Sequence, residues 1–111
     1  DQQVGVIDFD KHDFEETGCT FGQADGLVNK ALEVEGVRMA VLASEREDGI
    51  KMSLRAVEPD TVNDIAVLFG GGGHAQAAGC TIHAPLQEAL DQMLAAMKDK
   101  LDKTPRPEKR A

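Results

Sequence analysis

Four consecutive glycines, Gly70 to Gly73, constrain the fold of this 111-residue chain more than any other feature. Glycine loses more conformational freedom on folding than any other residue, so an ordered run of four is costly. A sharp turn with positive φ justifies glycine, and so does close approach of the backbone to a neighbouring segment or a ligand. Four in a row exceeds what a turn requires. The run therefore predicts an anion-binding loop, and a plain helix-to-strand connection is the alternative interpretation.

The glycines lie inside an uncharged stretch of the sequence. From residue 65 to residue 87 there is no Asp, Glu, Lys or Arg. Such a stretch is either mostly buried or faces a ligand. His74 follows the glycines, and mostly small residues follow His74 as far as Gly79. The segment 74–78 fits one helical turn, in which case the loop N–H groups and the helix dipole together favour a bound anion.

Hydrophobic periodicity predicts the other elements. Strands are expected at 4–9, 37–46, 50–56 and 79–83, and helices at 24–32, at 61–69 and at 85–101. The middle of 37–46 is apolar on both faces, so this strand is expected inside a sheet. Asp48 and Gly49 predict a two-residue hairpin. The order of elements predicts an α/β fold, a single domain whose mixed β-sheet of about four to five strands has helices packed on it.

Local signals mark the ends of the predicted helices. Gly36 is expected to end the first helix, and the glycine run ends the second. Asp60 or Thr61 is expected to cap the start of the second helix. Pro85 fits the first position of the last helix. Residues 1–103 are thus expected to form the domain, and the Pro- and Lys/Arg-rich residues 104–111 a disordered tail.

Composition excludes several classes of protein. A net charge of −8 disfavours a nucleic-acid binder that relies on a broadly basic surface. Aromatic residues make up only 4%, which argues against a run of base-stacking platforms. No run reaches 18 apolar residues, so no membrane partner is expected. Cys19 and Cys80 form no CxxC pair, which predicts two free thiols in a reducing cytoplasm.

Familiar nucleotide and metal motifs do not fit the sequence. A P-loop needs Lys and Ser or Thr after its glycines, and none follows here. A dinucleotide fingerprint must follow a strand, whereas this glycine run follows a helical pattern. Asp8, Asp10 and His12 are faintly metal-like, but an acidic surface loop is the ordinary interpretation. Metal-assisted hydrolysis needs clustered Asp and His ligands, so we expect no metal site and no catalytic residue in this chain.

Alternation along residues 50–56 places Lys51, Ser53 and Arg55 on one side of the predicted strand. If that side is solvated, they are ordinary surface residues. If it looks toward the glycine loop, Arg55 can clamp a carboxylate or phosphate and Ser53 adds a hydroxyl. One charge-assisted hydrogen bond of this kind contributes about 1.5–3 kcal/mol.

Two segments together resemble a known family. Lys51-Met-Ser53-Leu-Arg55 and Phe69-Gly-Gly-Gly-Gly73-His74-Ala-Gln-Ala-Ala-Gly79-Cys80 resemble the DHH-associated C-terminal domain of DHH phosphoesterases, in its oligoribonuclease and phosphoadenosine-phosphate phosphatase branch, often labelled exopolyphosphatase-related. The resemblance covers residues 1–103. Where the family usually has a second Ser after the Arg, this chain has Ala56, which has no hydroxyl to offer a substrate.

The resemblance implies one lobe of a two-lobed enzyme. An N-terminal DHH lobe would bind two Mn²⁺ ions and hydrolyse phosphate esters, and the associated lobe would hold the nucleotide. The matching substrate-contact positions are Ser53, Arg55, the backbone of Gly71, Gly72 and Gly73, and His74, which would face the scissile phosphate. The DHH motif is absent here, so this chain is expected to be the substrate-binding half, without the metals and inactive by itself. The implied partners are a short oligonucleotide or nucleotide phosphate, the DHH lobe of the same polypeptide and a second copy in a homodimer.

A second interpretation belongs to another class of function. The same domain type occurs in alanyl-tRNA synthetase and in single-strand-specific exonucleases, where it serves RNA or DNA binding or oligomerisation. The absence of a basic stripe in this acidic sequence argues against a long nucleic-acid ligand. A binding or oligomerisation module without a role in catalysis is therefore the alternative.

Overall fold

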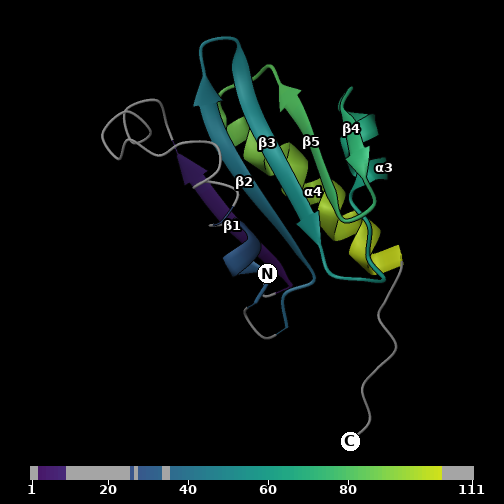
Figure 1. The fold of residues 1–111 in the computed structure, drawn as a ribbon. Coiled ribbons are helices and arrows are strands. Elements are labelled where there is room, and N and C mark those ends of the chain that lie inside the picture. The colour runs from purple at the N-terminus through teal and green to yellow at the C-terminus, as the bar shows by residue number, and fades with distance from the viewer. Residues whose placement is uncertain (1–2, 10–25, 27, 34–35, 104–111) are drawn as a thin grey trace, which may run out of the picture.

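Five strands form one mixed sheet in the order β1-β2-β3-β5-β4, which confirms the predicted α/β class (Figure 1). The computed structural model describes residues 3–9, 26, 28–33 and 36–103. The strands are β1 (Val4–Phe9), β2 (Met39–Arg46), β3 (Gly49–Ala56), β4 (Gly72–His74) and β5 (Ala77–Ile82). β1 pairs with β2 in parallel, and the other pairs are antiparallel. The prediction of a disordered tail at 104–111 lies outside the described residues.

One long helix supplies the main core. Helix α4 (Leu86–Lys103) lies behind the sheet in Figure 1, and the short helix α3 (Asn63–Leu68) lies beside β4. The helix predicted at 85–101 is confirmed, and its residues Leu90, Met93, Met97 and Leu101 are all buried. They pack against Ile50, Met52, Leu54 and Ala56, the apolar side of β3. β3 therefore alternates as predicted, with Lys51, Ser53 and Arg55 on the side away from α4.

Strand β2 is buried on both sides, as its continuous apolar sequence predicted. Met39 and Val41 belong to the cluster formed with α4. Ala40 and Leu42 belong to a smaller cluster on the other side of the sheet, together with Val28. Residues 28–31 are helical and cover β1 and β2 on this side of the sheet, the side away from α4. They do not cover β3, β5 and β4, which form the other half of the same side.

The structure contradicts the helical turn predicted for residues 74–78. Gly72 to His74 form β4, residues 75 and 76 form a turn, and β5 begins at Ala77 rather than Gly79. The physical reason is the antiparallel ladder that β4 forms with β5, with Gly72 opposite Gly79 and His74 opposite Ala77. No helix therefore begins at His74, and any attraction for an anion has to come from side chains and strand N–H groups.

Three predicted helix ends are also wrong. Val62 is the N-cap of α3, and its side chain has no atom that could make a cap bond. Asp60 and Thr61, the predicted caps, are engaged by Arg38 and Lys100 instead. The N-terminal helical segment ends at residue 31 and a turn follows, so Gly36, with φ of 90°, lies beyond its end. Helix α4 begins one residue after Pro85, whose carbonyl accepts a hydrogen bond from the Ala89 N–H at 2.8 Å.

A buried ion pair anchors the segment between β3 and α3. The Arg38 guanidinium donates through Nε to Asp60 Oδ2 at 2.8 Å and through Nη2 to Oδ1 at 2.7 Å. Both residues are about 95% buried, with exposed fractions of 4% and 5%. The hydrogen bonds from Arg38 to Asp60 outweigh the desolvation of the guanidinium, so the pKa of Arg38 is raised. No helix in the described part of the chain is long and apolar enough to cross a membrane.

Breaking this ion pair should be strongly destabilising. We expect Asp60→Asn to lower the free energy of unfolding by about 3–5 kcal/mol, because it leaves the Arg38 charge buried without its partner. Chemical denaturation measures the change. Asp99→Asn is the matched control, since Asp99 pairs with Lys103 on the exposed face of α4. The control should lose at most about 0.5 kcal/mol, and equal losses in the two variants would contradict the anchoring role.

Cys80 is a free, buried thiol, and Cys19 lies outside the described residues. Desolvation raises the pKa of Cys80 from 9.0 to about 11. The folded state therefore keeps its proton in a range of pH where the unfolded state loses it, so stability falls as the pH rises from about 9 to about 11. We expect Cys80→Ala to flatten this part of the stability curve, as measured by urea denaturation at a series of pH values. A slope identical to that of the unchanged chain would contradict the raised pKa.

Candidate functional site

Strand register brings the predicted site residues onto one face of the sheet. Residues directly opposite each other in an antiparallel pair point to the same side. Arg55 on β3 lies opposite Ala77 on β5, and Ala77 lies opposite His74 on β4. The next row is Ser53, Gly79 and Gly72. The two rows form what we call the open face, the side of β3, β5 and β4 that faces away from α4.

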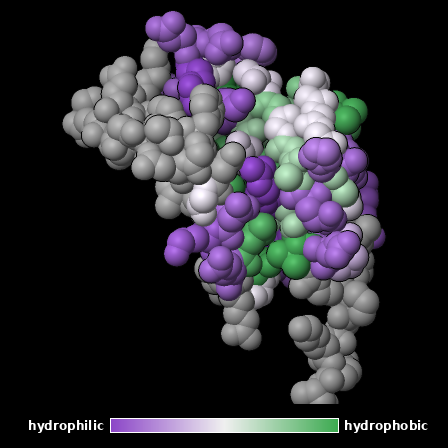
Figure 2. Space-filling model, viewed as in Figure 1, coloured by the Kyte–Doolittle hydropathy of each residue, from purple (hydrophilic) through white to green (hydrophobic). Residues whose placement is uncertain are grey.

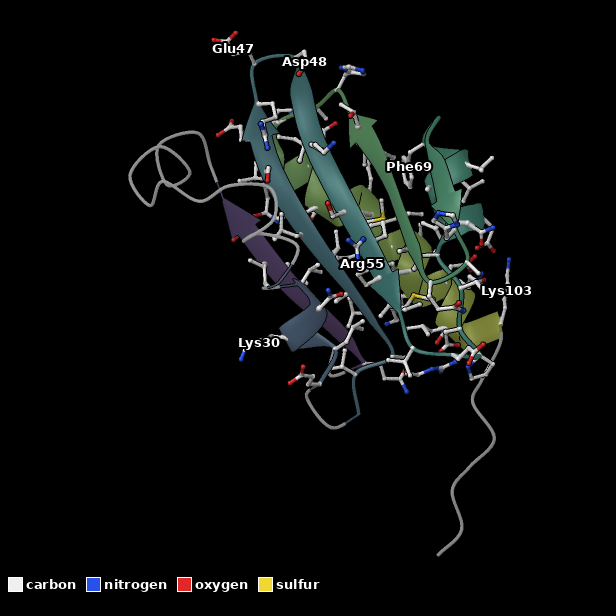
Figure 3. The ribbon with its side chains drawn as sticks, viewed as in Figure 1. Lys30, Glu47, Asp48, Arg55, Phe69 and Lys103 are labelled. Atoms are coloured by element: carbon white, nitrogen blue, oxygen red, sulfur yellow. The ribbon has the colours of Figure 1, made fainter. Side chains whose placement is uncertain are left out.

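The open face is shallow, and small residues form its floor. Neighbouring strands lie about 4.8 Å apart, so the Cα atoms of Arg55 and His74 are separated by roughly 10 Å with only the Ala77 methyl between them. Ser53 and Arg55 are half-buried, and His74 is exposed. Figure 3 shows Arg55 on the near side of β3, with α4 behind the sheet. The same side carries pale, weakly polar residues with hydrophilic ones among them in Figure 2.

The four glycines have different structural roles. Gly70 turns the chain after α3 with φ of 85°. A Cβ at Gly71 would lie 2.7 Å from the Cβ of Cys80, and a Cβ at Gly73 would lie 2.6 Å from the Cα of Ala78. Close packing of β4 on β5 therefore excludes side chains at these two positions. Gly72 is different, because a Cβ there would meet nothing within 4 Å.

Gly72 is thus the one glycine of the run that neither backbone conformation nor packing requires. Its position opposite Gly79 places any side chain of residue 72 on the open face. Glycine at 72 and 79 keeps the floor between Ser53 and the edge of the sheet free of side chains. The predicted close approach of a ligand to the backbone therefore applies best to Gly72, whereas the fold alone explains Gly70, Gly71 and Gly73.

Three positioning contacts that the sequence did not predict hold the β4–β5 turn. The Gln76 side chain donates to the Asp60 carbonyl at 2.9 Å, and the Val62 N–H donates to the Ala75 carbonyl at 2.8 Å. The Ala56 N–H donates to the Gln76 carbonyl at 3.1 Å. Because Asp60 is also the partner of Arg38, the turn that follows His74 is fixed to the end of β3 that carries Arg55. The sequence contained one signal for these contacts, the charged residue Arg38 directly before the apolar residues of β2.

The described residues offer no metal centre. No group of three or more His, Cys, Asp or Glu side chains among them could hold a metal ion. Asp8 is exposed on β1, whereas Asp10 and His12 of the faint metal-like pattern lie outside the described residues. On the open face, Arg55 offers a guanidinium, Ser53 a hydroxyl and His74 an imidazole, all groups that can form hydrogen bonds.

Comparison with known proteins points to one family. The sequence profile of the DHHA1 domain matches residues 2–103. A bifunctional oligoribonuclease and PAP phosphatase NrnA from Thermus thermophilus is 35% identical over 79 residues, which are 70% of this chain and 24% of that protein. The Bacillus subtilis protein of the same name is 31% identical over 88 residues, 79% of this chain and 27% of that protein. The chain thus spans about a quarter of the length of these relatives.

Solved structures show the same fold. An exopolyphosphatase-related protein from Bacteroides fragilis superposes with a TM-score of 0.80 at 27% identity, over 88% of this chain and 29% of that one. The C-Ala domain of Aquifex aeolicus alanyl-tRNA synthetase superposes with a TM-score of 0.64 over 86% of this chain and 87% of that domain. Its identity is only 14%, so this second likeness concerns the fold alone.

The different roles of the glycines can be tested by single alanine substitutions. We expect Gly71→Ala to lower the free energy of unfolding by at least about 1–3 kcal/mol, since the added methyl overlaps β5. Gly72→Ala should leave stability unchanged or slightly raised, because glycine costs entropy that alanine does not. Thermal denaturation compares the two variants. A loss at Gly72 as large as that at Gly71 would show that packing, rather than access to the open face, requires glycine there.

Proposed function

This chain belongs to the DHHA1 domain family, and on that premise we propose that it is the nucleotide-binding lobe of a DHH phosphoesterase. The ligand we propose is a phosphate group of a short oligoribonucleotide or of a pAp-like nucleotide. The names of the relatives, oligoribonuclease and PAP phosphatase, support this class of substrate. The single observation that carries the proposal is the row formed by Arg55, Ala77 and His74 across three strands.

The row can bind a phosphate by direct contact. Arg55 and His74 flank the Ala77 methyl, so an anion seated there would receive hydrogen bonds from both sides. Ser53, one row along, adds a hydroxyl, and Gly72 lets the anion approach the β4 backbone. Charge-assisted hydrogen bonds contribute about 1.5–3 kcal/mol each, enough for a local site in a chain of negative net charge. His74, at the exposed end of the row, would face the scissile phosphate as a hydrogen-bond donor.

We place hydrolysis itself outside this chain. The chain spans about a quarter of its curated relatives, and its described residues contain no cluster of metal ligands. We propose that a DHH lobe of the same polypeptide would hold two Mn²⁺ ions, which would activate a water molecule for hydrolysis of the phosphate ester, while the open face would hold the nucleotide. A cytoplasmic location would suit the free thiol of Cys80.

The second candidate is a binding or oligomerisation module with no part in catalysis, acting on RNA or DNA or joining two copies of the chain. The fold shared with the C-Ala domain supports it. This alternative predicts a steep salt dependence for RNA binding, because many phosphates are contacted, or else a dimer and no nucleotide affinity. A nucleotide lobe predicts a shallow salt dependence and requires Arg55 and His74.

Binding of the 5′-phosphorylated dinucleotide pApA to the 111-residue chain tests the proposal. We expect Arg55→Ala and His74→Ala each to raise the Kd by about tenfold or more, the value of one charge-assisted contact. Isothermal titration at fixed salt measures the affinity. Lys98→Ala is the matched control, because Lys98 is an exposed cation on α4, on the other side of the sheet.

The control variant should bind pApA as the unchanged chain does. Equal affinity in all three variants would contradict the assignment of the site to the open face. Absence of binding to the unchanged chain, together with a concentration-dependent dimer in sedimentation, would favour the oligomerisation module instead.

A further inference from the structure

The charges that the strands place on the two sides of the sheet differ in sign. On the side away from α4, strands β2 to β5 place Arg46, Lys51, Arg55 and His74 and no acidic residue, as their register shows. Glu45, the acidic residue of these four strands, lies in register with the side that faces α4. The whole chain carries −8, so a basic face within it is a local exception. A polyanion is the ligand that such a face favours.

The basic residues of β3 extend the open face beyond the row of Arg55 and His74. Lys51 lies four residues from Arg55 on the same side of β3, which places their Cα atoms about 13 Å apart, with Ser53 midway. Lys51 is directly opposite Thr81 on β5, and both side chains are exposed. Three rows of residues therefore follow one another along β3. The first contains Arg55 and His74, the second Ser53, Gly79 and Gly72, and the third Lys51 and Thr81.

We propose that Lys51 and Thr81 form a second phosphate subsite, so that the ligand runs along β3 and carries at least two phosphates. The inference rests on the proposed function and deepens it, since it defines the minimum number of phosphates that the substrate carries. An ammonium on a flexible stem and a neighbouring hydroxyl suit a phosphate that stays hydrated at an exposed site. The glycine floor of the middle row leaves room for the ribose that joins the two phosphates and for the base attached to it. A nucleotide with a single phosphate, such as AMP, would occupy only the first row.

The experiment compares a ligand with one phosphate and a ligand with two. Kd values for AMP and for pApA are measured with the 111-residue chain and with Lys51→Ala, Thr81→Val, Arg55→Ala and the control Lys98→Ala, each at several salt concentrations. We expect Lys51→Ala to weaken pApA about fivefold and Thr81→Val to weaken it less, with AMP changed by less than about twofold. Lys51→Arg should restore the affinity for pApA.

Salt dependence gives a second, independent readout. Each phosphate held by a cationic side chain makes binding weaken more steeply as salt is added. The unchanged chain should therefore show a steeper slope of log K against log salt for pApA than for AMP, and Lys51→Ala should make the slope for pApA shallower without changing that for AMP.

Two failures are distinguishable. If Arg55→Ala weakens the binding of both ligands while Lys51→Ala changes neither affinity, or changes both equally, the proposal of a second subsite is wrong. The proposed function as a nucleotide-binding lobe is then retained. If Arg55→Ala leaves both affinities unchanged, or if neither ligand binds, the proposed function is wrong and the subsite is wrong with it.

Discussion

The buried pair of Arg38 and Asp60 is the interaction on which the rest of the site depends. Two hydrogen bonds of 2.7 and 2.8 Å hold the segment after β3 against the start of β2. The β4–β5 turn is then bound to the same segment through Gln76 and Ala75. His74 directly precedes that turn, and Arg55 lies near the end of β3. The anchored segment after β3 therefore fixes the position of His74 relative to Arg55.

Different glycines of the run are needed for packing and for the open face. Gly71 and Gly73 let β4 lie close against β5, and this pairing aligns His74 with Arg55 across Ala77. Gly72 contributes by having no side chain on the open face. Within the stretch that has no Asp, Glu, Lys or Arg, residues 67–75 are mostly exposed rather than buried. Val67 and Leu68, with exposed fractions of 62% and 74%, are part of this segment.

The fold was predictable where its signals are local in sequence. The alternation of β3, the last helix and the continuous apolar run of β2 all follow from periodicity, and the structure confirms them. The prediction of a helical turn at 74–78 was wrong because small residues show no hydrophobic periodicity that would indicate a strand. Pairing with β5 determines that residues 72–74 form a strand. Asp60 was expected to cap a helix, but a partner 22 positions away in the sequence engages it instead.

The sequence by itself determined which residues could form the site and which face of β3 carries them, because side chains alternate along a strand whatever lies beside it. It also determined the family, because the DHHA1 profile matches residues 2–103. Only the tertiary structure decided that β5 lies between β3 and β4, and therefore that Arg55 faces His74 across one alanine and Lys51 faces Thr81. Strand order and register are set by long-range packing and hydrogen bonding, which no short window of sequence contains.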